Sequence, residues 1–199
     1  MLAWLLPATG FALAATFTPG PNNTMLAASG ANFGFARTAP HMAGVSLGFC
    51  VMFVSVALGA GSVLRAVPVL YTVLRYVGAA YLLYLAWKIA TSAPAAGEAG
   101  TRRARPFTFL QAAAFQWVNP KAWAGAAGAS VTYISPDELY LRTAAIALMF
   151  LVVTFGSVTF WTAIGAGVAR LLPGPKALRT FNLVMAALLV LSILPMLGD

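Results

Sequence analysis

Long stretches without a single charged residue constrain this chain more than any other feature of its sequence. They cover residues 2–36, 42–64, 76–87, 106–120, 122–136, 143–169 and 180–198. Of the 199 residues, 61% are hydrophobic and 8% are charged, whereas about a quarter of the residues in a soluble domain are charged. The sequence therefore predicts an all-α membrane protein with membrane crossings of about 20 residues each.

The apolar pattern predicts six transmembrane helices in a single polytopic membrane domain, residues 1–199. They lie within residues 2–30, 42–64, 69–89, 107–133, 139–166 and 177–197. The loop 93–106 has the proline, glycine and arginine content of a linker, and it separates a first repeat, 1–92, from a second, 107–199. Because each half contains an odd number of crossings, halves with a common fold must insert in opposite orientations, as inverted repeats.

Lysine and arginine are distributed unevenly between the two sides of this predicted topology. One side holds Arg37, Lys88, Arg102, Arg103, Arg105, Arg170, Lys176 and Arg179, and the other holds Arg65, Arg75 and Arg142. By the positive-inside rule the first side, with the linker, is cytoplasmic, and both termini lie on the outer side of the membrane. This bias accounts for the formal charge of +8. The lipid bilayer is therefore the expected surrounding, and no nucleic-acid partner is expected.

The first span predicts an interrupted helix. As one straight helix, residues 2–36 would be about 50 Å long, well beyond the roughly 30 Å of hydrocarbon. Pro19 and Pro21 lack N–H donors, so the carbonyls of Ala15 and Phe17 lose their helical partners. A second helix is expected to begin with Gly20 as its cap and Pro21 as its first residue.

The fourth span repeats this pattern in the second half of the chain. Asn119 is a predicted helix cap, and Pro120, at the next position, leaves the carbonyl of Gln116 free. Lys121 is the one cation deep in an apolar span, where its placement costs about 2.5 to 3.5 kcal/mol. Interrupted helices in corresponding positions of two halves predict a central binding site.

Such a site suits a zwitterion. A restarted helix offers N–H groups to a carboxylate, while free carbonyls and asparagine amides accept an ammonium group. The predicted binding residues are Thr18, Pro19, Gly20, Pro21, Asn22, Asn23, Asn119, Pro120 and Lys121, with Thr24, Gln116 and Trp117 expected to line the cavity. The alternative is structural: the prolines only kink the helices, and Lys121 snorkels or bonds backbone carbonyls.

The sequence lacks the residues that other functional classes require. A single cysteine, Cys50, excludes a thiol pair, and no span contains the histidine or glutamate pairs of an intramembrane protease; only Lys121 could serve as base to a buried serine. An exporter of metal or other ions is an alternative, but it requires clustered ligands. We expect no enzyme, cofactor or metal site. The glycine pairs Gly44 and Gly48, and Gly125 and Gly128, predict close helix packing.

The motif of residues 18–22, with Gly34, Gly44 and residues 119–121, resembles the LysE/RhtB family of amino acid exporters. The similarity extends over essentially the whole chain, including the run 78–82 followed by Trp87 and Lys88. It implies a secondary transporter of the inner membrane that exports small neutral amino acids, such as cysteine, O-acetylserine, homoserine or threonine, from the cytoplasm. The exporters for cysteine and O-acetylserine are the most similar subgroup.

The resemblance also implies coupling to the proton gradient, and it leaves a homodimer open. Many relatives carry an acidic residue after the glycine of the second span, where this chain has Gly48 and Phe49, and no aspartate or glutamate lies in any predicted span. The remaining choices are Lys121 or His41 as proton carrier, direct coupling to the substrate's own protons, or uncoupled exchange. His41 is otherwise a polar residue at a helix end.

Overall fold

The computed structural model describes residues 3–60, 68–92, 105–171 and 174–194, and these residues form helices without a β-strand. The elements are α1 (Leu5–Phe17), α2 (Pro21–Phe33), α3 (Phe35–Ser55), η1 (Val56–Ala60), α5 (Pro68–Ala90), α6 (Phe109–Gln116), α7 (Pro120–Tyr133), η2 (Pro136–Glu138), α8 (Leu139–Leu171) and α9 (Pro175–Leu191). The all-α prediction is confirmed. Most of the predicted linker, 93–104, and Arg65, Arg102 and Arg103 lie outside the described residues.

The predicted interruption of the first span is present. Helix α1 ends at Phe17, the extended residues 18–20 follow, and α2 begins with Gly20 as its cap and Pro21 at its first position. Because the two prolines cannot donate, the chain leaves the helix at this point and begins a new one.

The predicted start of the second span at Met42 is wrong, because α3 begins at Phe35. The turn that separates α2 from α3 is a single residue, Gly34, whose φ of 83° favours glycine. Pro40 lies inside the second turn of α3, and the hydroxyl of Thr38 donates to the carbonyl of Gly34 at 2.9 Å. Helix α3 continues into the π-helical segment η1, which contains Gly59 at φ 125°.

The second interruption lies between α6 and α7. Asn119 caps α7, and its side-chain oxygen accepts from the N–H of Lys121 at 3.1 Å, as predicted. The prediction of a free Gln116 carbonyl is wrong, because it accepts from the N–H of Asn119 at 3.2 Å. The residues of this break form a tight turn, which replaces the bond that Pro120 cannot supply.

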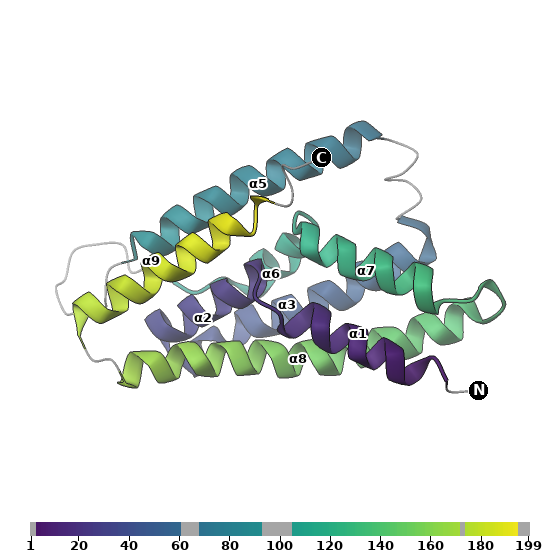
Figure 1. The fold of residues 1–199 in the computed structure, drawn as a ribbon, viewed down its shortest axis with the longest axis horizontal. Helices are drawn as coiled ribbons and strands as arrows, with labels where there is room; N and C mark the ends of the chain where they lie inside the picture. The colour runs from purple at the N-terminus through teal and green to yellow at the C-terminus, as the bar shows by residue number, and fades with distance from the viewer. Residues whose placement is uncertain (1–2, 61–67, 93–104, 172–173, 195–199) are drawn as a thin grey trace.

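Helix α8 extends along one side of the molecule (Figure 1). Helices α2 and α3 pack against α8, and α5 packs against α9 as a pair on another side. Helices α1 and α7 contact each other at one end, where the hydroxyl of Tyr133 donates to the carbonyl of Pro7 at 3.3 Å. The aromatic core at this end includes Phe49, Phe53 and Phe150.

Glycines allow two helix pairs to pack backbone against backbone. At Gly165 of α8 an added Cβ would collide with the carbonyl of Ala27 of α2, and at Gly30 of α2 it would collide with the carbonyl of Thr162. These contacts fix α2 against α8.

The same packing joins α3 to α6. A Cβ at Gly44 would collide with the carbonyl of Phe109, and one at Gly48 would lie 2.5 Å from Cα of Ala113. The predicted packing role of Gly44 and Gly48 is therefore confirmed.

Among the described residues, three helical segments are long and apolar enough to cross a membrane by length and composition: Phe35–Ala60, Thr72–Ala90 and Pro136–Leu171. The apolar helix Leu5–Phe17 is shorter. These lengths fit a protein that is embedded in a membrane.

Candidate functional site

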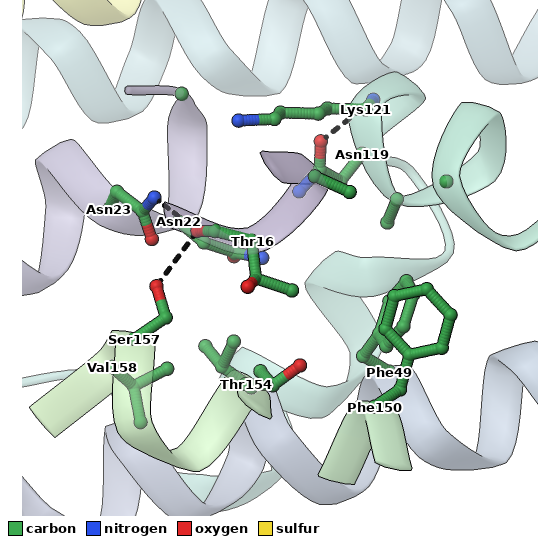
Figure 2. Close-up of a pocket in the computed structure, with 15 residues that line it drawn as sticks. Thr16, Asn22, Asn23, Phe49, Asn119, Lys121, Phe150, Thr154, Ser157 and Val158 are labelled. Atoms are coloured by element: carbon green, nitrogen blue, oxygen red, sulfur yellow. Dashed lines mark hydrogen bonds between the residues drawn. The ribbon is translucent and has the colours of Figure 1, made fainter. Parts of the chain in front are cut away.

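A small cavity lies beside both helix interruptions (Figure 2). Its volume is about 50 Å³, and its walls come from the end of α1, the start of α2, the start of α7, and the middle of α3 and α8. The lining residues are Ala15, Thr16, Gly20, Asn22, Asn23, Val45, Phe49, Asn119, Lys121, Ala122, Gly125, Phe150, Thr154, Ser157 and Val158.

Lys121 connects the second interruption to the first. Its ammonium group donates to the carbonyl oxygen of Thr18 at 2.7 Å, to the hydroxyl of Thr18 at 2.7 Å and to the carbonyl of Pro19 at 3.2 Å. Among the described residues neither carbonyl accepts a backbone N–H, so Lys121 supplies the hydrogen bonds that a continuous helix would supply.

Further side chains also donate to carbonyls at the first interruption. Asn23 donates through Nδ2 to the carbonyls of Thr16 at 2.7 Å and Thr18 at 2.8 Å. Ser157 of α8 donates to the carbonyl of Thr16 at 2.8 Å, as Figure 2 shows, and the indole of Trp161 donates to that of Phe17 at 3.2 Å. Helix α8 therefore holds the end of α1, and Asn23 of α2 bonds both that end and the extended segment.

Asn22 and Gln116 form a reciprocal pair of amides between α2 and α6. Nδ2 of Asn22 donates to Oε1 of Gln116 at 2.8 Å, and Nε2 of Gln116 donates to Oδ1 of Asn22 at 3.1 Å. Nε2 of Gln116 also donates to the carbonyl of Ala112 at 2.9 Å. This pair joins the halves of the chain through polar groups.

The polar wall of the cavity retains unused hydrogen-bonding capacity. Within the described part of the chain, no partner bonds Oδ1 of Asn23, Nδ2 of Asn119, or the backbone N–H groups of Asn22 and Asn23. The N–H groups belong to the first turn of α2, where the helix dipole favours an anion. These groups offer donors to a carboxylate and an acceptor to an ammonium group, and Lys121 adds a positive charge beside them.

The opposite wall is mostly apolar. Val45 and Phe49 come from α3, and Phe150 and Val158 come from α8. The rings of Phe49 and Phe150 meet edge to face with centroids 5.2 Å apart. The cavity therefore has one polar wall and one apolar wall, an arrangement typical of small-molecule sites.

The structure brings part of the predicted set together. Gly20, Asn22, Asn23, Asn119 and Lys121 line the cavity. The other predicted residues are not among its lining residues and lie next to the interruptions in the chain: Thr18, Pro19, Pro21, Thr24, Gln116, Trp117 and Pro120.

His41 is not among the lining residues of the cavity. It is buried in α3, with its ring 5.2 Å from the ring of Phe107. Neither of its ring nitrogens has a hydrogen-bond partner in the described residues.

The sequence-based prediction omitted the contribution of α8. Thr154 and Ser157 lie among apolar residues of that helix and line the cavity. Their spacing of three residues places them on the same face as Phe150 and Val158. Polar residues at helical spacing within an apolar span were the indication available in the sequence. The described residues contain no group of three or more histidine, cysteine, aspartate or glutamate side chains that could hold a metal ion.

The chain is also similar to known proteins. The family model described as LysE type translocator matches residues 13–193. The chain belongs to the LysE type translocator family. As a LysE-family member it is a transporter and not an enzyme.

Three relatives are named cysteine/O-acetylserine efflux protein. Those of Salmonella choleraesuis (strain SC-B67) and Salmonella typhimurium are each 36% identical to the LysE-family chain over 182 residues, which is 90% of either protein. That of Escherichia coli (strain K12) is 34% identical over the same share of both chains. No solved structure matches.

Proposed function

We propose that this chain exports small neutral amino acids of the cysteine and O-acetylserine class from the cytoplasm. The relatives named cysteine/O-acetylserine efflux protein match this chain over 90% of their length. The observation on which the proposal rests is the cavity beside both interruptions, where Lys121 and the first turn of α2 face a carboxylate-sized space and Asn23 offers an acceptor. An amino acid backbone carries both of the charges that this wall can bind.

The proposed topology has six crossings in two inverted repeats. The first comprises α1 with α2, then α3 and α5; the second comprises α6 with α7, then α8 and α9. In support of it, these units run in alternating directions along the long axis of Figure 1. Lys88, Arg170 and Lys176 lie near the helix ends that the positive-inside rule assigns to the cytoplasm. In this proposed topology both termini lie on the outer side of the inner membrane. A homodimer stays a prediction from the family resemblance.

In the proposed cycle, the arrangement with the small cavity is a closed state. A volume of about 50 Å³ is well below the roughly 300 Å³ of the smallest ordinary ligand pockets, so the walls must separate when substrate enters. The glycine contacts make α2 with α8 one unit and α3 with α6 another, and we propose that these units move apart. The substrate carboxylate then takes the place of the carbonyls that bond Lys121.

The proposed driving force is the proton gradient. No aspartate or glutamate lies in any of the α-helices, so Lys121 and His41 are the titratable groups that such coupling would use. Lys121 is the stronger candidate for the proton carrier, because it lines the cavity and His41 does not.

The test is counterflow in proteoliposomes that contain the purified protein. Vesicles loaded with unlabelled O-acetylserine should accumulate labelled O-acetylserine and cysteine, whereas labelled lysine and glutamate and divalent cations should not accumulate. Accumulation of a divalent cation without any amino acid would contradict the proposal and favour the ion-exporter alternative.

A further inference from the structure

The hydroxyl of Thr154 is buried without a hydrogen bond. The residue is 6% exposed, and its Oγ1 has no partner within the described residues. A buried polar group is nearly always bonded in a folded protein, so an unbonded one needs an explanation.

The free hydroxyl departs from the pattern of the other helices in the described residues. Hydroxyls in these helices commonly donate to the carbonyl four residues earlier, which is the local way to satisfy a hydroxyl in an apolar helix. Residues that do so are Thr9, Thr16, Thr18, Thr24, Thr38, Ser46, Ser55, Thr91, Ser130 and Thr180. The corresponding acceptor for Thr154 would be the carbonyl of Phe150, and no such bond forms. The hydroxyl is therefore available to another partner.

The position of Thr154 shows what that partner would be. Oγ1 atoms of Thr143, Thr159 and Thr162 on the same helix are also buried and unbonded, but Thr154 is the one of these four that lines the cavity. Figure 2 shows its side chain between the polar wall at Asn22 and Asn23 and the rings of Phe49 and Phe150.

The chemistry around Thr154 restricts the substrate side chain. Val45, Phe49, Phe150 and Val158 line the cavity with it, and Lys121 is the one charged residue among the lining residues. Ser157, one turn away, already donates its hydroxyl to a backbone carbonyl. A charged side chain would be unpaired at this wall, and a purely apolar one would leave the threonine hydroxyl unbonded.

We propose that Thr154 determines specificity by hydrogen bonding to an oxygen or sulfur at the γ position of the substrate. The substrate class would then be serine-like, comprising cysteine, serine and acylated serine, in preference to isosteric apolar amino acids. This inference rests on the proposed function, since it assigns the polar wall to the amino acid head group and the Thr154 wall to the side chain.

The test compares two isosteric competitors against labelled O-acetylserine in proteoliposomes. Serine and 2-aminobutyrate differ by a hydroxyl in place of a methyl group, and the ratio of their inhibition constants reports the bond to that hydroxyl. Thr154→Val keeps the shape of the side chain and removes its hydroxyl. We expect the preference for serine to fall about three- to tenfold, the range for one neutral hydrogen bond.

Two further variants keep the result interpretable. Thr154→Ser should restore the wild-type ratio, and Thr143→Val, which removes an equally buried and unbonded hydroxyl on the same helix away from the cavity, should leave it unchanged. An unchanged ratio in Thr154→Val, with normal transport by the wild type, would overturn this inference alone. Absence of O-acetylserine transport by the wild type would overturn the proposed function and this inference with it.

Discussion

The ammonium group of Lys121 lies 2.7 Å from both the carbonyl and the hydroxyl oxygen of Thr18, so a residue of the second helix interruption bonds the first. These residues are separated by more than 100 positions in the chain. Each interruption alone would leave polar groups unsatisfied in an apolar surrounding. Their contact makes the interruptions interdependent, and the predictions that follow test this dependence.

Gly20→Ala should reduce transport because it displaces the side chain of Lys121. The backbone of Gly20 is extended, so alanine causes no strain there, but its Cβ would lie 2.8 Å from Cδ of Lys121. We expect Lys121 to be displaced from the carbonyls and transport to fall about tenfold, the loss of one charge-assisted hydrogen bond. In an efflux assay, Gly10→Ala is the control, because nothing lies within 4 Å of a Cβ at Gly10. Equal transport by wild type and Gly20→Ala would show that the close approach has no functional role.

The Asn22 and Gln116 amides should show coupling in a double-mutant cycle. Gln116 is 0% exposed, so Asn22→Ala leaves its buried Oε1 without a donor, at a cost of about 1 to 3 kcal/mol in the free energy of unfolding. Gln116→Ala should cost a similar amount. Because the double variant leaves neither group without its partner, its loss should be smaller than the sum of the single losses. Strictly additive losses in detergent unfolding experiments would contradict the paired arrangement.

Gly165→Ala should destabilise the packing of α2 on α8. Its Cβ would collide with the backbone carbonyl of Ala27, which cannot move as a side chain can. We expect a loss of about 1 to 3 kcal/mol, seen as a lower midpoint of thermal unfolding. Gly167→Ala on the same helix has open space around its Cβ, so it should be neutral or stabilising by up to about 1 kcal/mol. The same midpoint for both variants would argue against the close approach.

Cysteine introduced at position 154 should be reactive only when the cavity opens. In a Cys50→Ala background, Thr154→Cys should be labelled by a small thiol reagent in vesicles without substrate and protected by O-acetylserine, since the substrate occupies the same space. Thr143→Cys, which is buried away from the cavity, should stay unlabelled. Labelling is read by mass spectrometry. Labelling of Thr154→Cys that the substrate does not reduce would place the transport path elsewhere.

The helix interruptions could be predicted from the sequence because their cause is local. A proline has no N–H wherever it stands, and a glycine or asparagine before it caps the next helix. Gly20, Pro21, Asn119 and Pro120 therefore take their predicted places. The start of α3 is harder to predict. Arg37, Pro40 and His41 have the composition of a loop, yet they lie inside the helix, and Gly34 alone makes the turn.

The partners of each polar group could not be predicted, because they depend on tertiary packing. The pattern indicated that Asn22, Asn23 and Lys121 are polar residues at membrane depth, and it did not show that Asn22 bonds Gln116 or that Lys121 bonds Thr18. Likewise nothing in the local sequence separates Thr154, which lines the cavity, from Thr143, which does not.

Substitution of Lys121 by methionine tests the central claim most directly. Methionine keeps the length and apolar stem of the side chain and removes the charge that bonds the first interruption. Lys88→Met is the matched control, because Lys88 is exposed on α5 and is not among the lining residues of the cavity. In O-acetylserine counterflow, Lys121→Met should lose about tenfold or more of its rate while Lys88→Met retains it. Equal rates in the two variants, at equal amounts of folded protein, would contradict the account.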